Sequence, residues 1–328
     1  MYQGEEVVIY NLYGEFEEIA TLTSNVLEER GHPTSRTTTP DPNSLKLYLI
    51  FGANVWEDAV LFPPRYIIFQ LEQSPIRKWF IPSYFARLQN ALQVWDYNLQ
   101  NIDYLRERGI DAIHVPLGYC PLFASPIYPP ETIDILFLGQ LRNNHREATI
   151  TALREAGFTV VANNKTFGEQ KKQVVAQAKI VLNLHYGHQA ILEEPRIIPL
   201  LTAGKVVISE TVDDPRYIQL YQDSVIFVQD TNDLIAQCHK WLNVGTMARR
   251  EWGLKVSRWV MTQRKAIDLW PWQVLELERP PEVPYYDFLV NAPDTCGMAF
   301  TPRTAHLLFT GWKAVKHYGE RTLMQRTY

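Results

Sequence analysis

The sequence is poor in cysteine, and its cysteines stand far apart. Cys120, Cys238 and Cys296 are the only three in 328 residues, and none of them belongs to a CxxC pair. An odd and scattered set excludes a disulfide framework and gives no sign of a zinc site. Such cysteine usage is typical of proteins from a reducing compartment.

A long apolar run and an excess of basic charge are also missing. No stretch of about 18 apolar residues occurs, and the first residues, MYQGEEVVIYNLYGEF, lack the basic start and apolar core of a secretory signal. The 32 lysines and arginines face 36 aspartates and glutamates, for a formal net charge of −4. This balance favours neither nucleic acid nor an anionic membrane as a partner. We therefore expect a cytoplasmic protein without a membrane span.

What the sequence does contain is a regular alternation of strand-like and helix-like segments. At 328 residues and 46% hydrophobic content, the chain is too long for one ordinary core. Apolar runs of strand length alternate with segments of helical periodicity, which predicts parallel, doubly wound α/β sheets. The expected strands are residues 7–11, 45–51, 66–69, 93–95, 112–117, 134–138, 159–162, 180–184, 206–208 and 224–228.

Prolines mark the expected domain boundaries. Pro121, Pro126, Pro129 and Pro130 can continue neither a helix nor a central strand, so they indicate a linker. We expect an N-terminal domain over 1–127, a second domain over 128–245, and a C-terminal extension over 246–328. The extension begins with a helix over 249–264 and continues as a segment rich in proline and aromatic residues.

The first candidate site follows the first strand of the second domain. Gly139 ends that strand, and Arg142 and Arg146 follow just before or at the start of a helix. Because a helix N-terminus presents unpaired N–H groups and a positive dipole, this loop could hold a diphosphate. It lacks the GxGxxG spacing of a dinucleotide site, so an ordinary solvated loop remains an alternative.

The second candidate site lies after the apolar run that ends at Leu184. His185 and Tyr186 come next, and Glu193 and Arg196 stand three residues apart near the start of a helix. The last two could form a plain surface ion pair, and His185 could be a packing residue. At the carboxyl end of a parallel strand, however, Glu193 could accept ribose hydroxyls and Arg196 could bind a phosphate.

Acidic residues at strand ends of the first domain are candidates for a general base. Glu72 follows the strand over 66–69 directly and is the first choice, with His185 as a second catalytic candidate. Glu15 and Asp96 could lie on the acceptor side. Each also has a structural interpretation, Glu15 as a first-turn helix charge and Asp96 as an N-cap.

Taken together, these motifs resemble GT-B glycosyltransferases, in particular a bacterial and viral branch related to glycosyltransferase families 1 and 4 and to CgeB-like proteins. The similarity runs from about Val7 to Leu242, and residues 264–328 lie outside it. The segments that carry it are Gln70 to Gln73, Val94 to Tyr97 with Asn101, Pro116 to Tyr119, Asp134 to Gly139 with Arg142, Leu182 to Tyr186, and Val206 to Glu210.

The resemblance implies two facing Rossmann-like domains, a nucleotide-sugar donor on the second, an acceptor on the first, and a C-terminal helix that returns to the first. The implied donor-site residues are Gly139, Arg142, His185, Tyr186, Glu193, Arg196 and Glu210. Many retaining relatives carry two glutamates where Ile191 and Pro199 stand here. Glu193 is the expected substitute for the ribose ligand.

These observations predict a hexosyl- or pentosyltransferase that moves a sugar from a nucleoside diphosphate to a hydroxyl of a glycan, lipid, protein or other acceptor. No Asp-x-Asp metal motif is evident, since Asp213 and Asp214 precede Pro215 and suggest a turn, so we expect no metal and no tightly bound cofactor. A non-catalytic GT-B-like assembly module is the main alternative, and a nucleotide-sugar epimerase is a weaker one. For a viral protein the compartment would be the host cytoplasm.

Overall fold

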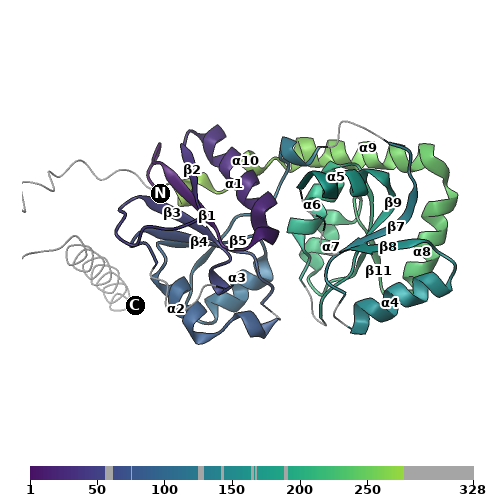
Figure 1. The fold of residues 1–328 in the computed structure, drawn as a ribbon, viewed down its shortest axis with the longest axis horizontal. Helices are drawn as coiled ribbons and strands as arrows, with labels where there is room; N and C mark the ends of the chain where they lie inside the picture. The colour runs from purple at the N-terminus through teal and green to yellow at the C-terminus, as the bar shows by residue number, and fades with distance from the viewer. Residues whose placement is uncertain are drawn as a thin grey trace, which may run out of the picture.

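The computed structural model of the chain contains two α/β domains that lie side by side (Figure 1). It describes residues 1–55, 62–74, 76–124, 129–141, 144–163, 166, 168–187 and 191–276. The expected boundary between the first two domains falls at residues 127 and 128, which lie outside the described residues. None of the described helices combines the length and apolar composition needed to cross a bilayer.

A six-stranded parallel sheet forms the centre of the first domain, in the order β2-β1-β3-β4-β5-β6. Its central strands are buried on both faces, which explains why they read as continuous apolar runs and do not alternate. The strands are β1 (Val7–Asn11), β2 (Thr34–Thr37), β3 (Leu47–Phe51), β4 (Tyr66–Gln70), β5 (Gln93–Asp96) and β6 (Ala112–His114).

Helices cover both faces of this sheet. Side chains of α1 (Glu17–Arg30) pack with one set of strand residues, and those of α2 (Pro82–Asn90) and α3 (Leu99–Arg106) pack with the alternate set. Gly31 ends α1 with a φ of 98°, a left-handed conformation that glycine adopts without strain. Short 3₁₀ helices complete the domain, and they are η1 (Gly14–Phe16), η2 (Ala53–Val55), η3 (Arg77–Trp79) and η4 (Pro121–Phe123).

The second domain repeats the plan with a five-stranded parallel sheet in the order β11-β10-β9-β7-β8. Its strands are β7 (Ile133–Leu138), β8 (Val160–Asn163), β9 (Ala178–Asn183), β10 (Val206–Glu210) and β11 (Ile226–Val228). Its helices are α4 (Asn144–Glu155), α5 (Gly168–Gln177), α6 (Glu194–Thr202), α7 (Pro215–Tyr221) and α8 (Thr231–Asn243).

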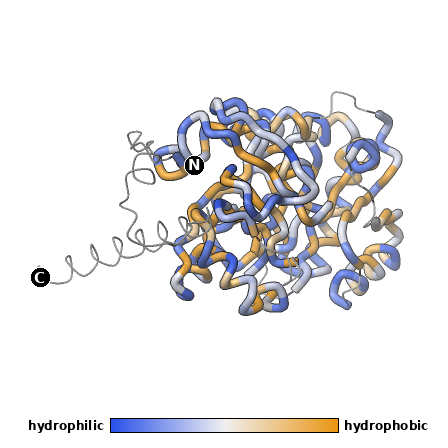
Figure 2. Tube along the Cα trace, turned by 60° about the vertical axis from the view of Figure 1, so that its left-hand side comes forward, coloured by the Kyte–Doolittle hydropathy of each residue, from blue (hydrophilic) through white to orange (hydrophobic). Residues whose placement is uncertain are grey.

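The strand orders place a ligand crevice in each domain. In both sheets the order reverses beside the first strand, between β1 and β3 and between β7 and β9. In open parallel sheets, ligands bind beyond the carboxyl ends of the strands at such a reversal. Hydrophobic segments run through the interior of both domains, and hydrophilic segments lie mainly outside (Figure 2). One buried cluster is continuous from α1 of the first domain to α6 of the second.

The chain returns from the second domain to the first after a long helix. Helix α9 (Gly245–Gln263) packs on α6, and the short helix α10 (Ala266–Leu269) then contacts α1 (Figure 1). Helix α11 (Trp272–Leu275) follows, and the carbonyl of Leu275 accepts a bond from the N-terminal ammonium of Met1. Thus residues 264–276 contact the first domain, whereas the helix expected to return lies mainly on the second.

Two local features differ from the sequence-based expectations. Strand β2 is absent from the expected strands, because its polar residues pair only at the edge of the sheet. Pro215 begins helix α7 and is not part of a simple turn, since Asp214 caps the helix by accepting a bond from the N–H of Arg216.

Candidate functional site

A cavity of about 1110 Å³ lies between the two domains at the carboxyl ends of their strands. Both crevices predicted by the strand orders open into it, so loops from each sheet form its walls. The first domain contributes charged and aromatic side chains that include Glu15, Glu18, Glu72, Lys78 and Trp79. The second domain contributes Gly139, Arg146, Lys171, Tyr186, Glu193 and Arg196.

Glu72 reaches the cavity from a loop that a buried polar network holds in place. The side chain of Gln70 accepts a bond from the N–H of Glu72 at 2.5 Å and donates to its carbonyl at 2.8 Å. Asn101 donates to the same carbonyl at 2.9 Å and accepts from the N–H of Ser74. Because Gln70 and Asn101 both also donate to the carboxylate of Asp96, one buried acid orients both amides.

Asp96 therefore supports this loop from behind, whereas the sequence-based prediction placed it among the residues on the acceptor side. Its side chain is fully buried and does not line the cavity. Burial raises the pKa of Asp96 well above its usual range. Hydrogen bonds from Asn98, Asn101 and Gln70 lower the pKa, but burial outweighs them. Asp96 is also not the N-cap of α3, a role that belongs to Asn98. By contrast, Glu15 lies in η1, is exposed and lines the cavity.

The carboxyl of Glu72 has an unusual affinity for its proton. Burial raises its pKa from 4.5 to about 7, and the nearby charge of Glu15 adds to the increase. A bond from Asn54, 3.1 Å from Glu72 Oε1, and the charge of Lys78 oppose it. A carboxylate with this pKa can accept a proton near neutral pH, as a general base must.

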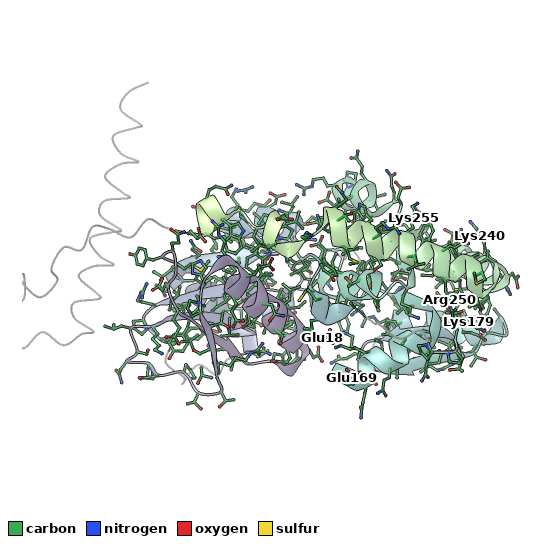
Figure 3. The ribbon with its side chains drawn as sticks, turned by 90° about the horizontal axis from the view of Figure 1, so that it is seen from above. Glu18, Glu169, Lys179, Lys240, Arg250 and Lys255 are labelled. Atoms are coloured by element: carbon green, nitrogen blue, oxygen red, sulfur yellow. The ribbon has the colours of Figure 1, made fainter. Side chains whose placement is uncertain are left out.

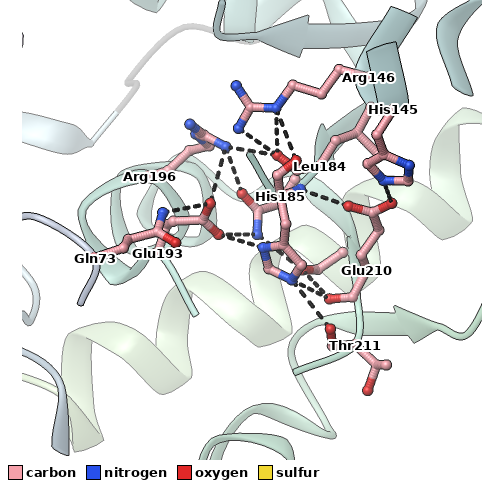
Figure 4. Close-up of polar contacts among 11 residues, drawn as sticks. Gln73, His145, Arg146, Leu184, His185, Glu193, Arg196, Glu210 and Thr211 are labelled. Atoms are coloured by element: carbon pink, nitrogen blue, oxygen red, sulfur yellow. Dashed lines mark hydrogen bonds and ion pairs between the residues drawn. The ribbon is translucent and has the colours of Figure 1, made fainter. Parts of the chain in front are cut away.

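Glu193 and Arg196 line the opposite wall of the cavity (Figure 4). Glu193 is 5% exposed, so the surface ion pair considered from sequence is excluded. Its Oε2 accepts bonds from Asn183 and His185, both 2.9 Å away. Burial alone would raise the pKa of Glu193, but these partners and the charge of Arg196 lower it to about 2. Glu193 is therefore an ionised carboxylate over the whole physiological range.

Arg196 keeps part of its guanidinium available. Its Nη1 donates to Asn183 Oδ1 at 2.9 Å and to the Leu184 carbonyl at 3.4 Å, and it lies 3.8 Å from Glu193 Oε1. Nε and Nη2 of Arg196 make no hydrogen bond to any described residue. Asn183, the last residue of β9, thus bridges Glu193 and Arg196. Sequence analysis missed it, although a polar residue at the end of an apolar strand is a usable signal.

His185 is a wall residue and not a group that faces the cavity. His185 is 6% exposed and does not line the cavity. Its Nε2 faces the carbonyls of Glu210 and Thr211 at 3.1 and 3.2 Å, and its Nδ1 faces the Glu193 carboxylate. Burial lowers the pKa of His185, but the carboxylate of Glu193 outweighs burial and raises it overall. Both ring nitrogens of His185 face acceptors, an arrangement that favours the protonated ring and argues against a direct catalytic role.

Arg146 lines the cavity but serves mainly as a clamp on the backbone. Its guanidinium donates to the carbonyls of Gln140, Leu184 and His185 at 2.7–3.1 Å. Burial lowers the pKa of Arg146 to about 10, and Arg196 contributes to the shift. The clamp joins the loop after β7 to the loop after β9.

The loop after β7 has little room at Gly139. A side chain there would contact the ring of Phe137, so this loop needs glycine. The predicted phosphate ligand Arg142 lies outside the described residues.

Glu210 also lies behind the cavity wall. Its Oε2 accepts a bond from the N–H of His185 at 2.6 Å, and its Oε1 lies 2.5 Å from Nε2 of His145. Glu210 does not line the cavity, so the structure places it as a support of the loop after β9. Tyr186, in contrast, lines the cavity.

Side chains of the two domains meet across the cavity. Nε2 of Gln73 donates to Oε1 of Glu193 at 3.1 Å, which links the residue after Glu72 to a carboxylate of the second domain. Lys171 and Glu18 form a second link, with an ion pair of 2.6 Å. Figure 3 shows Glu18 on α1 and Glu169 on α5 where the two domains face each other. No sequence pattern predicted these pairs, because their members lie more than 100 residues apart.

No group of three or more His, Cys, Asp or Glu side chains that could hold a metal ion occurs in the described part of the chain. The groups that line the cavity include the carboxylates of Glu72 from the first domain and Glu193 from the second, the guanidinium of Arg196 and the ring of Tyr186.

Comparison with known proteins gives no match to any family model. One curated relative, the uncharacterised protein R358 of Acanthamoeba polyphaga mimivirus, is 25% identical over 162 residues. The match covers 48% of this chain and 55% of the relative, so this chain spans about half the length of the relative.

Solved structures show the fold. HepE of Anabaena, solved in complex with UDP and glucose, is 10% identical and has a TM-score of 0.55, over 83% of this chain and 98% of HepE. Sucrose-phosphate synthase of Thermosynechococcus elongatus is 12% identical with a TM-score of 0.49, over 83% of this chain and 96% of the synthase. The likeness to HepE, with the two parallel-sheet domains and the helical C-terminal region, confirms the predicted GT-B fold.

Proposed function

We propose that the protein is a glycosyltransferase that moves a sugar from a nucleoside diphosphate to an acceptor hydroxyl. One observation carries the proposal. Glu72 from the first domain and Glu193 and Arg196 from the second line one cavity at the strand reversals of both sheets. A GT-B fold alone would not suffice, because one fold hosts many chemistries.

The second domain would hold the donor. Glu193, already ionised, would accept the ribose hydroxyls, and Nε and Nη2 of Arg196 would donate to the diphosphate. The N-terminus of α4, at Asn144, would add its positive dipole next to the loop after Gly139. HepE was solved with UDP and glucose, which supports UDP-sugars as the first donors to test.

The first domain would supply the base. Glu72 would take the proton from the acceptor hydroxyl while the acceptor oxygen bonds to the anomeric carbon and the bond to the leaving diphosphate breaks. Negative charge then appears on the diphosphate, where Arg196 can stabilise it. Domain closure would exclude water, which would otherwise hydrolyse the donor.

The first test is thermal unfolding with UDP, GDP, dTDP and CDP, followed by transfer assays with the matching nucleotide-sugars. A nucleotide at 100 times its Kd should stabilise the chain by about 2.7 kcal/mol. Arg196→Ala should lose both that stabilisation and transfer, because charge-assisted bonds to phosphate are lost. Arg106→Ala is the control, since Arg106 is an exposed partner of Asp103 and does not line the cavity.

The outcomes separate the proposal from its main alternative. Stabilisation by a nucleotide together with transfer supports a glycosyltransferase. Stabilisation without turnover of any nucleotide-sugar would favour a non-catalytic module. That alternative has some support, because buried Ile191 and Pro199 stand where many retaining glycosyltransferases carry two glutamates. No effect of any nucleotide would refute the donor site.

A further inference from the structure

Lys78 is a first-domain cation that reaches the second domain across the cavity. It lies in η3 and lines the cavity. Its ammonium is 4.6 Å from the ring centroid of Trp79 and 5.1 Å from that of Tyr186, which belongs to the second domain. Such ring contacts hold a cation in place without neutralising its charge.

Lys78 lacks the anionic partner that the neighbouring lysines have. Lys171 pairs with Glu18 at 2.6 Å, and Lys172 lies 3.8 Å from Glu169. Lys78 makes no ion pair and no hydrogen bond with any described residue. Its charge is felt by Glu72, whose pKa is raised by burial and partly lowered again by Lys78. The ammonium of Lys78 is therefore held by two aromatic rings and can still form an ion pair with an anion in the cavity.

Lys78 lines the same cavity as Arg196, so both could contact one anion bound by the second domain. The Tyr186 ring lies beside the ammonium of Lys78 and also 5.3 Å from the guanidinium carbon of Arg146. Tyr186 closely follows Leu184, whose carbonyl accepts a bond from Arg196. An anion next to Arg196 and the Tyr186 ring would thus have a first-domain cation at its other side.

We propose that Lys78 binds the diphosphate of the donor and stabilises the charge that appears on it when the sugar leaves. This inference rests on the proposed function and adds a residue of the acceptor-side domain to the leaving-group site. As the anomeric carbon–oxygen bond breaks, the electron pair stays on the diphosphate, and the ammonium of Lys78 donates a hydrogen bond to one of its oxygens. A cation from each domain then holds the leaving group, and so donor binding favours closure.

The test compares Lys78→Met with Lys78→Arg and with a matched control. Methionine keeps a long apolar side chain and removes the charge, whereas arginine keeps the charge. Lys46→Met is the control, because Lys46 is a first-domain lysine that pairs with Glu6 and does not line the cavity. Calorimetry gives the Kd of UDP and of UMP for each variant, with GDP and GMP in parallel. Steady-state kinetics with the nucleotide-sugar gives kcat and KM.

We expect Lys78→Met to weaken UDP binding and to lower kcat by about 10- to 100-fold each, the usual effect of losing a charge-assisted bond. Binding of UMP should change less than threefold, because it lacks the second phosphate. Lys78→Arg should restore most of both quantities, and Lys46→Met should match the native chain. Equal UDP affinity and kcat in Lys78→Met and native protein would overturn the inference and leave the proposed function intact. Failure of the native chain to bind any diphosphate would overturn both.

Discussion

Two carboxylates that face the same cavity differ in pKa because their surroundings differ. Burial dominates at Glu72 and raises its pKa to about 7. Glu193 is buried as well, yet a histidine, an asparagine and an arginine lower its pKa to about 2. Such a pair suits two different tasks, one group that exchanges a proton near neutral pH and one that stays charged.

The two shifts have opposite effects on stability. For Glu72, whose folded pKa lies above 4.5, the stabilising contribution is present below pH 4.5 and is lost as the pH rises through about 7. For Glu193, whose folded pKa lies below 4.5, the contribution is present above pH 4.5 and is lost as the pH falls toward 2. The price of an active Glu72 is thus a less stable chain above neutral pH.

The transfer rate should rise with pH through a midpoint near 7, because Glu72 must be ionised to accept a proton. Glu72→Gln should lower kcat by about 10²- to 10⁴-fold, the usual contribution of a general base, and should remove this rise. The measurement is kcat between pH 5 and 9.

Two further variants test the assignment of that midpoint. Glu15→Gln should move it to lower pH, since the charge of Glu15 raises the pKa of Glu72. Asn54→Ala should move it to higher pH, since the bond from Asn54 lowers that pKa. A midpoint that neither variant moves would assign the titration to another group.

At the scale of elements, the crossing of α6 and α9 determines how the chain leaves the second domain. Gly204, just after α6, and Gly253, within α9, approach so closely that a Cβ on Gly253 would overlap the carbonyl of Gly204. Gly204 has a φ of 67° and Gly253 is buried. Ser257 adds a bond to the carbonyl of Thr202 at 2.9 Å. Glycine is required here for close backbone contact.

Gly253→Ala should destabilise the protein by about 1–3 kcal/mol, the typical cost of overpacking. The sign of this change in stability is informative, because in a helix that has room for the extra methyl group alanine is favoured over glycine by about 1 kcal/mol. Urea unfolding followed by tryptophan fluorescence measures the difference. Thr262→Ala, on the exposed face of α9, is the control and should stay within about 0.5 kcal/mol. A more stable Gly253→Ala variant would show that the helices can separate without cost.

At the scale of the whole molecule, the two segments that connect the domains lie side by side. Tyr119, where the chain leaves the first domain, and Lys265, where it returns to it, form a parallel bridge. A Cβ on Gly118 would overlap the carbonyl of Arg264. Arg264 donates to the Leu117 carbonyl and to Glu194 Oε1 at 3.1 and 2.9 Å. A buried ion pair at the start of α6 therefore connects both segments to this helix of the second domain.

Arg264→Gln should destabilise the chain by about 3–5 kcal/mol, because it leaves the buried carboxylate of Glu194 without its cation. The double variant Arg264→Leu with Glu194→Leu should recover a large part of this loss, since no buried charge remains. Arg36→Gln breaks an exposed pair with Glu17 and should cost less than about 1 kcal/mol. Guanidinium unfolding measures all three. Equal effects of Arg264→Gln and Arg36→Gln would contradict a buried role for the pair.

Most of the fold follows from local sequence pattern. Central strands of a doubly covered parallel sheet must be apolar on both faces, so runs such as residues 47–51 and 180–184 stand out from sequence alone. Glycines with positive φ, such as Gly31 and Gly157, mark helix ends for a similarly local reason. Strand β2 does not stand out, because its polar residues become a strand only through pairing at the sheet edge.

The site was predictable only in part. Pattern alone placed Glu72 and Asp96 at strand ends and Glu193 and Arg196 near the start of a helix that follows a strand. These positions meet because the carboxyl ends of parallel strands share one edge of a sheet. The pattern could not tell which of them face the cavity. Tertiary packing turned Glu72 and Glu193 inward and placed Asp96 and His185 behind them as supports. It also brought Gln73 to Glu193 and Lys78 to Tyr186, because such contacts depend on how two separately folded domains meet.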